Sequence, residues 1–233
     1  MSESESRRIK YFQGEREIYI PTSERNLKCS VIKRVNEGKV WETRISKRIF
    51  NDTKPNTMAI DIGANIGVHT ISMIDAVGKN GFVIAFEPQI CIRECLRKTL
   101  YCYDGNYIIS GDLVSDKNNK ETFYSDGTGR SRIPIEGDRY SKNWEKSIKN
   151  TTTLDSYLTW NHPPISLIKI DVEGHEFQVL KGSQETIDKY KPIIYIEVWS
   201  KKGDYEKLVK WCADNNYKIE KISPNDYKLE SKE

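Results

Sequence analysis

The middle of the chain alternates short apolar segments with longer amphipathic ones, and this alternation limits the folds that are open to it. The apolar segments have the length of buried strands, and the segments between them have the apolar spacing of helices. Strands joined by helical crossovers form a parallel sheet that helices cover on both faces. We therefore expect an α/β fold with a doubly wound, mostly parallel sheet. The predicted strands are 58–62, 81–88, 106–110, 163–172 and 192–199, and the predicted helices are 66–77, 89–103, 151–160, 176–190 and 204–216.

The two ends of the chain add elements outside this alternation. Two short segments, 217–222 and 226–230, flank the turn SPND and predict an antiparallel pair of strands. Near the other end, 17–21 and 27–35 alternate enough to predict a hairpin. Residues 38–50 follow with the spacing of an amphipathic helix.

Three segments are more polar than the rest. Residues 1–10 are typical of a short solvated tail, and they lack the apolar core of a signal peptide. Residues 120–125 predict a short edge strand, and 126–150 predict a loop or lid. We accordingly divide the chain into an N-terminal extension (residues 1–57, hairpin plus helix), which packs on the core, and a nucleotide-binding domain, 58–233.

Composition excludes several classes of protein. The 233 residues are enough for one good core, and 37% hydrophobic with 30% charged residues suits a globular protein with a charged surface. No apolar run approaches the ~20 residues of a membrane helix. A net charge of +3 does not demand a nucleic-acid partner. The five cysteines lack zinc spacing and fit a reduced protein, so we expect a cytoplasmic setting.

The stretch MAIDIGANIGVHT, residues 58–70, has the strand–turn–helix pattern of a nucleotide site. It does not fit a dinucleotide fingerprint, because the G-x-G-x-x-G spacing counted from Gly63 meets Asn65 and Val68. No Gly-Lys-Ser/Thr follows, so a P-loop is excluded as well. We expect Asp61 at the carboxyl end of its strand, facing the crevice, where a carboxylate repels pyrophosphate and favours a cationic ligand. S-adenosylmethionine, which carries an adenosine and a sulfonium but no phosphate, meets these conditions.

Two interpretations of this turn stay open. In the first, Gly63 and Gly67 let the backbone approach the ligand closely, and a helix that starts near Asn65 offers its amides to the methionine carboxylate. In the second, Asp61 only caps the following helix and the glycines only serve a tight turn.

Acidic residues follow one predicted strand after another. Ligands of doubly wound sheets bind outside the carboxyl ends of the strands, so these residues are expected at one edge. An acid at the end of the second strand suits the ribose hydroxyls, and one after the third suits the adenine amino group. Repulsion among such acids requires a cation, a proton or a hydrogen-bonding ligand in compensation. The side chains expected at this edge are Asp61, Glu87, Asp112, Lys169, Asp171, Glu173, His175, Glu197 and Trp199.

An ordered set of motifs resembles the FkbM-type methyltransferases. The motifs are AIDIGANIGVHT, VIAFEP, TTTLDSYL, ISLIKIDVEGHEFQVLKG and PIIYIEVW, which together cover roughly residues 58–199. The resemblance implies a seven-stranded Rossmann-like fold and S-adenosylmethionine-dependent O-methylation, most often of hydroxyls on sugars or other natural products. Members differ in acceptor, so the acceptor does not carry over. On these motifs, the residues expected to bind the cofactor are Asp61, Gly63, Asn65, Gly67, Thr70, Glu87, Pro88, Asp112 and Asp171.

The motif IKIDVEGHE supplies the candidates for catalysis. Methyl transfer needs the acceptor oxygen held against the methyl carbon and its proton removed. Asp171 is favoured for orienting or deprotonating the acceptor, with Lys169 holding it ionised. His175 suits proton transfer near neutral pH, or else bonds locally at a helix start, and Glu173 is either a third candidate or a cap. The candidates for contact with the acceptor are Glu197 and Trp199, the latter by stacking on a sugar face.

Three alternatives remain from the sequence. A divalent metal held by Asp171, Glu173 and Glu197 is possible but not favoured, because no Asp-Asn pair accompanies them. The acceptor is a small molecule or glycan in the main hypothesis and RNA or a cap structure in the second. In the third, the chain is a cofactor-binding module without a catalytic role. The oligomeric state is not predicted.

Overall fold

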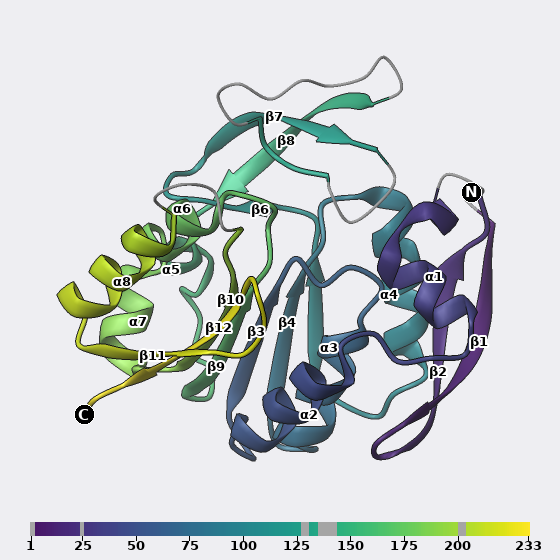
Figure 1. Cartoon of the computed structure of the whole chain (residues 1–233), viewed down its shortest axis with the longest axis horizontal. Helices are drawn as coiled ribbons and strands as arrows, with labels where there is room; N and C mark the ends of the chain where they lie inside the picture. Colours follow the sequence, from purple (N-terminus) through teal and green to yellow (C-terminus); the bar gives the residue numbers. More distant parts are fainter. Residues whose placement is uncertain (1–2, 24–25, 127–130, 135–143, 200–203) are drawn as a thin grey trace.

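A seven-stranded sheet forms the centre of the computed structural model, which describes residues 3–23, 26–126, 131–134, 144–199 and 204–233 (Figure 1). The strand order is β11-β12-β10-β9-β3-β4-β5, and β5, β4, β3, β9 and β10 run parallel. The final pair, β11 and β12, is antiparallel, as predicted, and β12 also pairs antiparallel with β10. The mostly parallel α/β fold expected from the sequence is confirmed. The bounds are β3 Met58–Ile62, β4 Phe82–Phe86, β5 Tyr107–Ser110, β9 Ile165–Ile170, β10 Ile193–Glu197, β11 Tyr217–Lys221 and β12 Asp226–Ser231.

The central strands bury side chains on both faces, because helices cover both (Figure 1). In β3, Met58, Ile60 and Ile62 belong to the apolar cluster on the side of α5–α8, whereas Ala59 belongs to the cluster on the side of α1–α4. Strand alternation therefore sends the side chain of Asp61 toward α3. The helices are α1 Ser30–Asn36, α2 Thr43–Asp52, α3 Val68–Val77, α4 Ile90–Tyr101, α5 Leu154–Tyr157, α6 Glu176–Lys181, α7 Gln184–Tyr190 and α8 Asp204–Asp214.

One predicted helix, 176–190, is two helices. α6 ends and α7 begins around Gly182 and Ser183. A Cβ at Gly182 would stand 1.9 Å from the carbonyl oxygen of Ser115, so the chain has room only for glycine where the two segments meet. α3 also begins at Val68, two residues later than predicted, because the turn before it is longer.

The N-terminal region differs from the prediction in its partners. The predicted strand 17–21 lies in β2 (Gly14–Pro21), but it pairs with β1 (Ser4–Tyr11). The tail expected at 1–10 is thus wrong over residues 4–10, and residues 1–2 lie outside the described part. The strand expected at 27–35 is also wrong, because this segment forms the 3-10 helix η1 (Asn26–Lys28) and α1. The helix predicted at 38–50 is α2 and begins at Thr43.

A second sheet lies over the carboxyl ends of the central strands (Figure 1). Its order is β6-β8-β7, with β6 Leu113–Val114, β7 Asn119–Ser125 and β8 Glu145–Thr152. The predicted edge strand 120–125 is β7, but it belongs to this sheet. The loop predicted at 126–150 is wrong over 145–150, which pairs with β7 along its whole length. Residues 127–130 and 135–143 of that prediction lie outside the described residues.

No helix among the described residues is long and apolar enough to span a bilayer.

Candidate functional site

A cavity of about 560 Å³ lies at the carboxyl edge of the central sheet. Its walls come from the ends of β3, β4, β9 and β10, from β6 and β7 of the upper sheet, and from residues 28–31 and 41–42 of the N-terminal region. Its size is that of a small-molecule or cofactor site. The position agrees with the rule that ligands of doubly wound sheets bind beyond the carboxyl ends of the strands.

Most of the residues singled out in the sequence line this cavity, and four do not. Asp61, Gly67 and Thr70 are buried behind the lining, and Lys169 borders a smaller hollow of about 30 Å³ together with His69 and Asp171. The residues that line the main cavity are Gly63, Asn65, Glu87, Pro88, Asp112, Asp171, Glu173, His175, Glu197 and Trp199.

The turn after β3 is held tightly against its neighbours. The N–H groups of Gly63 and Ala64 both donate to the carbonyl oxygen of Phe86, each at 3.0 Å. Gly63 has φ +85, and a Cβ there would stand 1.8 Å from the carbonyl oxygen of Asp171. Glycine is therefore required for the ends of β3, β4 and β9 to meet.

Glu87 is a buried carboxylate that faces the cavity. One oxygen accepts the N–H of Asn65 at 3.0 Å, and the other accepts the N–H of Gln89 at 2.8 Å. Burial raises the pKa of Glu87 to about 7, although these two amides oppose the shift. Each oxygen keeps a lone pair, so the carboxylate can still accept two hydroxyl hydrogens. Asp112, which lines the same cavity, accepts a hydrogen bond from the Ser110 hydroxyl at 3.1 Å.

Lys169 joins two carboxylates beneath the cavity floor. Its Nζ lies 3.2 Å from Oδ2 of Asp171 and 3.7 Å from Oδ1 of Asp61. Asp61 also accepts a 2.6 Å hydrogen bond from the Thr70 hydroxyl, and its side chain is fully buried. Burial opposes the charge of Lys169, but Asp171 and Asp61 outweigh it and raise its pKa. Asp61 thus lies behind the lining and reaches the cavity only through Lys169.

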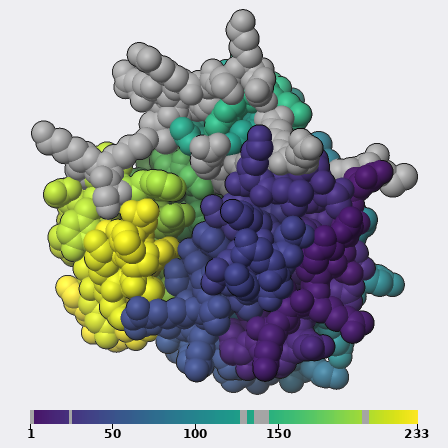
Figure 2. Space-filling model, turned by 45° about the vertical axis from the view of Figure 1, so that its right-hand side comes forward, coloured from purple at the N-terminus to yellow at the C-terminus, as the bar shows by residue number. Residues whose placement is uncertain are grey.

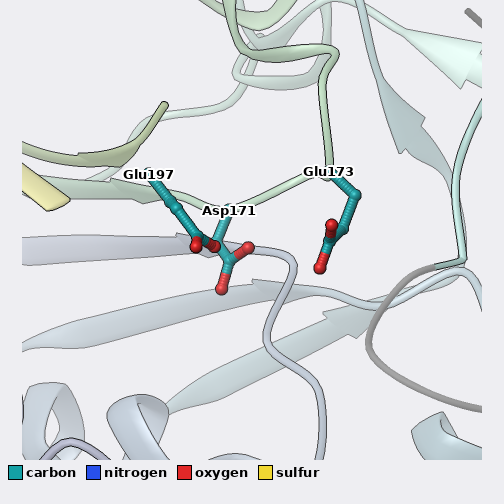
Figure 3. A group of neighbouring side chains, drawn as sticks. All are labelled: Asp171, Glu173 and Glu197. Atoms are coloured by element: carbon teal, nitrogen blue, oxygen red, sulfur yellow. The ribbon is translucent and has the colours of Figure 1, made fainter. Parts of the chain in front are cut away.

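Three acidic side chains meet above this ion pair. Oxygen atoms of Asp171, Glu173 and Glu197 all lie within 4.8 Å of one another. Figure 3 shows the carboxyl groups of Asp171 and Glu197 turned toward each other, with that of Glu173 pointing into the same space. These are the side chains that the sequence offered as possible metal ligands, and oxygen donors of this kind suit Mg²⁺.

The three acids differ in their tendency to hold a proton. Burial favours a neutral Asp171, but the Lys169 ammonium prevails and lowers its pKa. Burial and the charge of Asp171 raise the pKa of Glu197. Burial, followed by the charge of Asp171, raises the pKa of Glu173 to about 8.

His175 makes a hydrogen bond across to the segment after β6. Its Nε2 lies 2.9 Å from the hydroxyl oxygen of Ser115, and burial lowers its pKa. The imidazole is therefore held neutral at the cavity wall. It occupies the N-cap position of α6 without making a side-chain cap.

Some cavity residues were not found from the sequence. Trp41 and Glu42 come from the N-terminal region, and Phe123 and Arg132 come from around the upper sheet. None belongs to a motif, and their nearness to the turn after β3 depends on tertiary packing. The only local signal is the apolar and aromatic character of Trp41 and Phe123, which equally fits a core position.

This architecture, a seven-stranded sheet with an antiparallel final pair and a ligand cavity at its carboxyl edge, defines the class I methyltransferase fold. Residues 61–219 match the model of the methyltransferase FkbM domain. Because this match covers more than half of the chain, the protein belongs to the FkbM methyltransferase family. A search of the curated proteins finds no match.

Solved structures with the same fold share little sequence with this chain. A methyltransferase FkbM from Methylobacillus flagellatus is 16% identical with a TM-score of 0.54, covering 81% of this chain and 51% of its own. The 16S rRNA N2 G1207 methyltransferase of T. thermophilus, solved with AdoMet and guanosine, is 10% identical with a TM-score of 0.52. The match covers 100% of this chain and 52% of that methyltransferase. A SAM-dependent O-methyltransferase from Thermotoga maritima is 11% identical with a TM-score of 0.51, and the match covers 96% of this chain and 76% of the Thermotoga protein. The chain thus spans about half the length of the Methylobacillus protein.

Proposed function

We propose that this chain is an S-adenosylmethionine-dependent O-methyltransferase whose acceptor is a hydroxyl of a sugar, a glycan or a sugar-containing small molecule. The observation that carries the proposal is the acidic lining of the cavity. Among the described lining residues, six are acidic and only two, Lys28 and Arg132, carry a permanent positive charge; the six are Glu42, Glu87, Asp112, Asp171, Glu173 and Glu197. Such a lining offers carboxyl groups as hydrogen-bond partners to the hydroxyls of a ribose and of a polyhydroxyl acceptor, and it has few cations to hold a phosphate.

The polar groups present fit this cofactor. In the proposal, Glu87 accepts hydrogen bonds from the ribose hydroxyls with the lone pairs that its two amide partners leave free. Asp112 receives the adenine amino group, and Pro88 lines the same end of the cavity. Gly63, Asn65, Gly67 and Thr70 form or support the turn beside the amino-acid part. Asp61 does not contact the cofactor in this proposal but pairs with Lys169, which in turn holds Asp171 at the cavity.

The acids at the end of β9 handle the acceptor. The bound cofactor supplies an electrophilic methyl group, and its leaving group is neutral. Asp171, kept ionised by Lys169, accepts a hydrogen bond from the acceptor hydroxyl and orients its oxygen. Glu173, whose pKa is raised to about 8, receives the proton in its ionised form. Glu197 and Trp199 contact the acceptor, and neutral His175 lines the same cavity.

Lys169 already supplies a cation to Asp171, and in the proposal the reaction does not require a metal. Activity should survive exhaustive chelation, and loss of activity that added Mg²⁺ restores would favour the metal alternative instead.

The test of the function is a search for the methyl acceptor. Calorimetry with S-adenosylhomocysteine establishes whether the cofactor binds. A panel of sugars, glycans and short RNAs is then incubated with S-adenosylmethionine, and products are detected by a mass increase of one methyl group. A sugar product supports the proposal, an RNA product favours the second hypothesis, and binding without any product favours a non-catalytic module. A salt titration separates RNA binding further, because phosphate contacts weaken steeply with salt.

The proposal also divides the chain into a methyltransferase domain, 58–233, and an extension, 1–57, that packs on it. The packing that supports this division is extensive. Ile9, Ile18 and Ile20 of the β1–β2 hairpin are buried in the same apolar cluster as Leu96 and Leu100 of α4. Figure 2 shows the N-terminal extension, in purple and dark blue, spread over one face of the molecule.

A further inference from the structure

The N-terminal region forms one wall of the cavity, although it lies outside the 61–219 match to the family. Val31 and Trp41 line both the main cavity and the smaller hollow beside it. Gly63 and Asn65 of the turn after β3 line both as well. This wall therefore stands directly against the turn.

Glu42 of this wall has an unusual backbone for its position. It is the N-cap residue of α2, with φ 44 and ψ 47 in the left-handed region, which a residue other than glycine rarely adopts. Its side chain makes no cap to its own helix, so helix capping does not account for this conformation. Backbone strain of this kind is typical of functional sites.

The Glu42 carboxylate is instead held by a buried histidine. Oε2 of Glu42 lies 3.1 Å from Nε2 of His69, and Nδ1 of His69 lies 3.0 Å from the Ser46 hydroxyl. With the Ser46 hydroxyl donating to Nδ1, the Nε2–H of His69 donates to Glu42. His69 is 8% exposed, whereas Glu42 is 31% exposed and lines the cavity. The carboxylate is thus fixed at the wall with a face open to the cavity.

The position of this wall indicates which part of the donor it meets. Under the proposed function, Glu87 and Asp112 take the adenosine, so the amino-acid part lies along the turn of Gly63 and Asn65. That part carries an ammonium group, which requires an anionic partner. The nearby Asp61 is buried behind the lining and Asp171 is paired with Lys169. Glu87 also contacts the turn but is assigned to the ribose, and the ion pair that the described residues give Glu42 is the one with His69.

We propose that Glu42, held by His69, binds the ammonium group of the amino-acid part of the cofactor. The inference rests on the proposed cofactor. It gives the N-terminal extension a role in binding that the family match does not include.

The test compares two ligands in the full chain. S-adenosylhomocysteine contains the ammonium, and 5′-methylthioadenosine retains the adenosine and the thioether but lacks the amino-acid part. For Glu42→Gln, we expect the Kd of S-adenosylhomocysteine to rise roughly 10–100-fold by calorimetry, since a charge-assisted hydrogen bond is lost. The Kd of 5′-methylthioadenosine should not change. Glutamine keeps an oxygen that accepts from His69, and an unchanged unfolding temperature verifies the fold.

Glu37→Gln is the matched control. Glu37 lies at the end of α1, five residues before Glu42, and pairs on the surface with Lys39 at 3.1 Å. It should alter neither Kd. If Glu42→Gln binds both ligands as the wild type does, or loses both equally, the inference is overturned and the proposed function stands. If the wild type binds neither ligand, the proposed function itself fails.

Discussion

Lys169 is the residue on which the acidic edge of the sheet most depends. It is 6% exposed and lies between the carboxylates of Asp61 and Asp171. Burying such charges is costly, and their mutual attraction compensates only while all partners are present. An uncompensated buried carboxylate is more damaging to stability than a lost surface ion pair.

The first prediction concerns Lys169→Met. Removing the ammonium leaves Asp61 and Asp171 without their cation, so we expect the free energy of unfolding to fall by about 3–5 kcal/mol. Urea denaturation measures this loss. The control is Lys181→Met, which removes an exposed pair with Asp116 and should cost no more than about 1 kcal/mol. Equal losses in the two variants would show that the buried ion pairs of Lys169 stabilise the fold no more than a surface ion pair does.

The second prediction concerns Asp171→Asn. The amide is isosteric but cannot remain negatively charged, so we expect turnover to drop by roughly 10²–10⁴-fold. Binding of S-adenosylhomocysteine should be largely retained, because the ribose and adenine contacts proposed for Glu87 and Asp112 are intact. Single-turnover kinetics and calorimetry measure the two effects. Asp188→Asn, on the surface of α7, is the control, and turnover that persists in Asp171→Asn rejects the catalytic role.

The site residues differ in how far the sequence could reveal them. Those at strand ends, such as Glu87 and Glu197, reach the cavity because the carboxyl ends of parallel strands share one edge. Asp61 has the same motif position but alternates with Ile60 and Ile62, so its side chain turns toward α3. Glu42 could not be predicted, because its contact with His69 joins two segments 27 residues apart through packing alone.

At the scale of elements, the turn between β3 and α3 determines how the strand ends meet. Gly63 approaches Asp171, the first residue after β9, so closely that a side chain at this turn would displace the end of β9. The geometry of the site thus depends on one glycine as well as on its charged groups.

The third prediction compares two glycines with positive φ. Gly38 has φ +72 and open space around its missing Cβ, so Gly38→Ala should cost only the roughly 1–2 kcal/mol of a left-handed backbone. Gly63→Ala adds a clash with the Asp171 carbonyl, and we expect about 4 kcal/mol or more. Denaturant midpoints measure both. Comparable losses would mean that the contact relaxes without cost.

The elements predicted best were those with strong periodicity. The strands β3, β4, β9 and β10 are mostly apolar and buried on both faces, a pattern typical of the central strands of a parallel sheet. The segment 27–35 was misassigned because Ile32 and Val35, three residues apart, are buried by a helix, although the segment also alternates. β8 was missed because only Thr151 among its residues is buried, so its sequence has no apolar face.

At the scale of the whole molecule, carboxyl groups in the cavity and at the start of α6 keep protons in the folded state. Burial raises the pKa of Glu87 and Glu176 to about 7 and that of Glu173 to about 8. In the unfolded chain a glutamate titrates near ~4.3. The folded state therefore binds more protons than the unfolded state between these values, and the free energy of unfolding falls as the pH rises through this window.

The fourth prediction is that the protein without ligand is less stable at pH 8 than at pH 6.5. His175 acts in the opposite direction, because burial lowers its pKa and the unfolded chain takes up a proton there near ~6.5. At pH 6.5 about half of this histidine is still protonated in the unfolded chain, so above that pH it contributes only about 0.4 kcal/mol, less than the three carboxyl groups together. Thermal unfolding at both pH values measures the difference. Glu173→Gln removes the group that titrates at about 8 and should reduce the difference, whereas Glu15→Gln, at an exposed position near the start of β2, should not. A protein that is equally or more stable at pH 8 would mean that these carboxyl groups are already ionised in the folded state, and that the cavity holds its negative charge without help from protons.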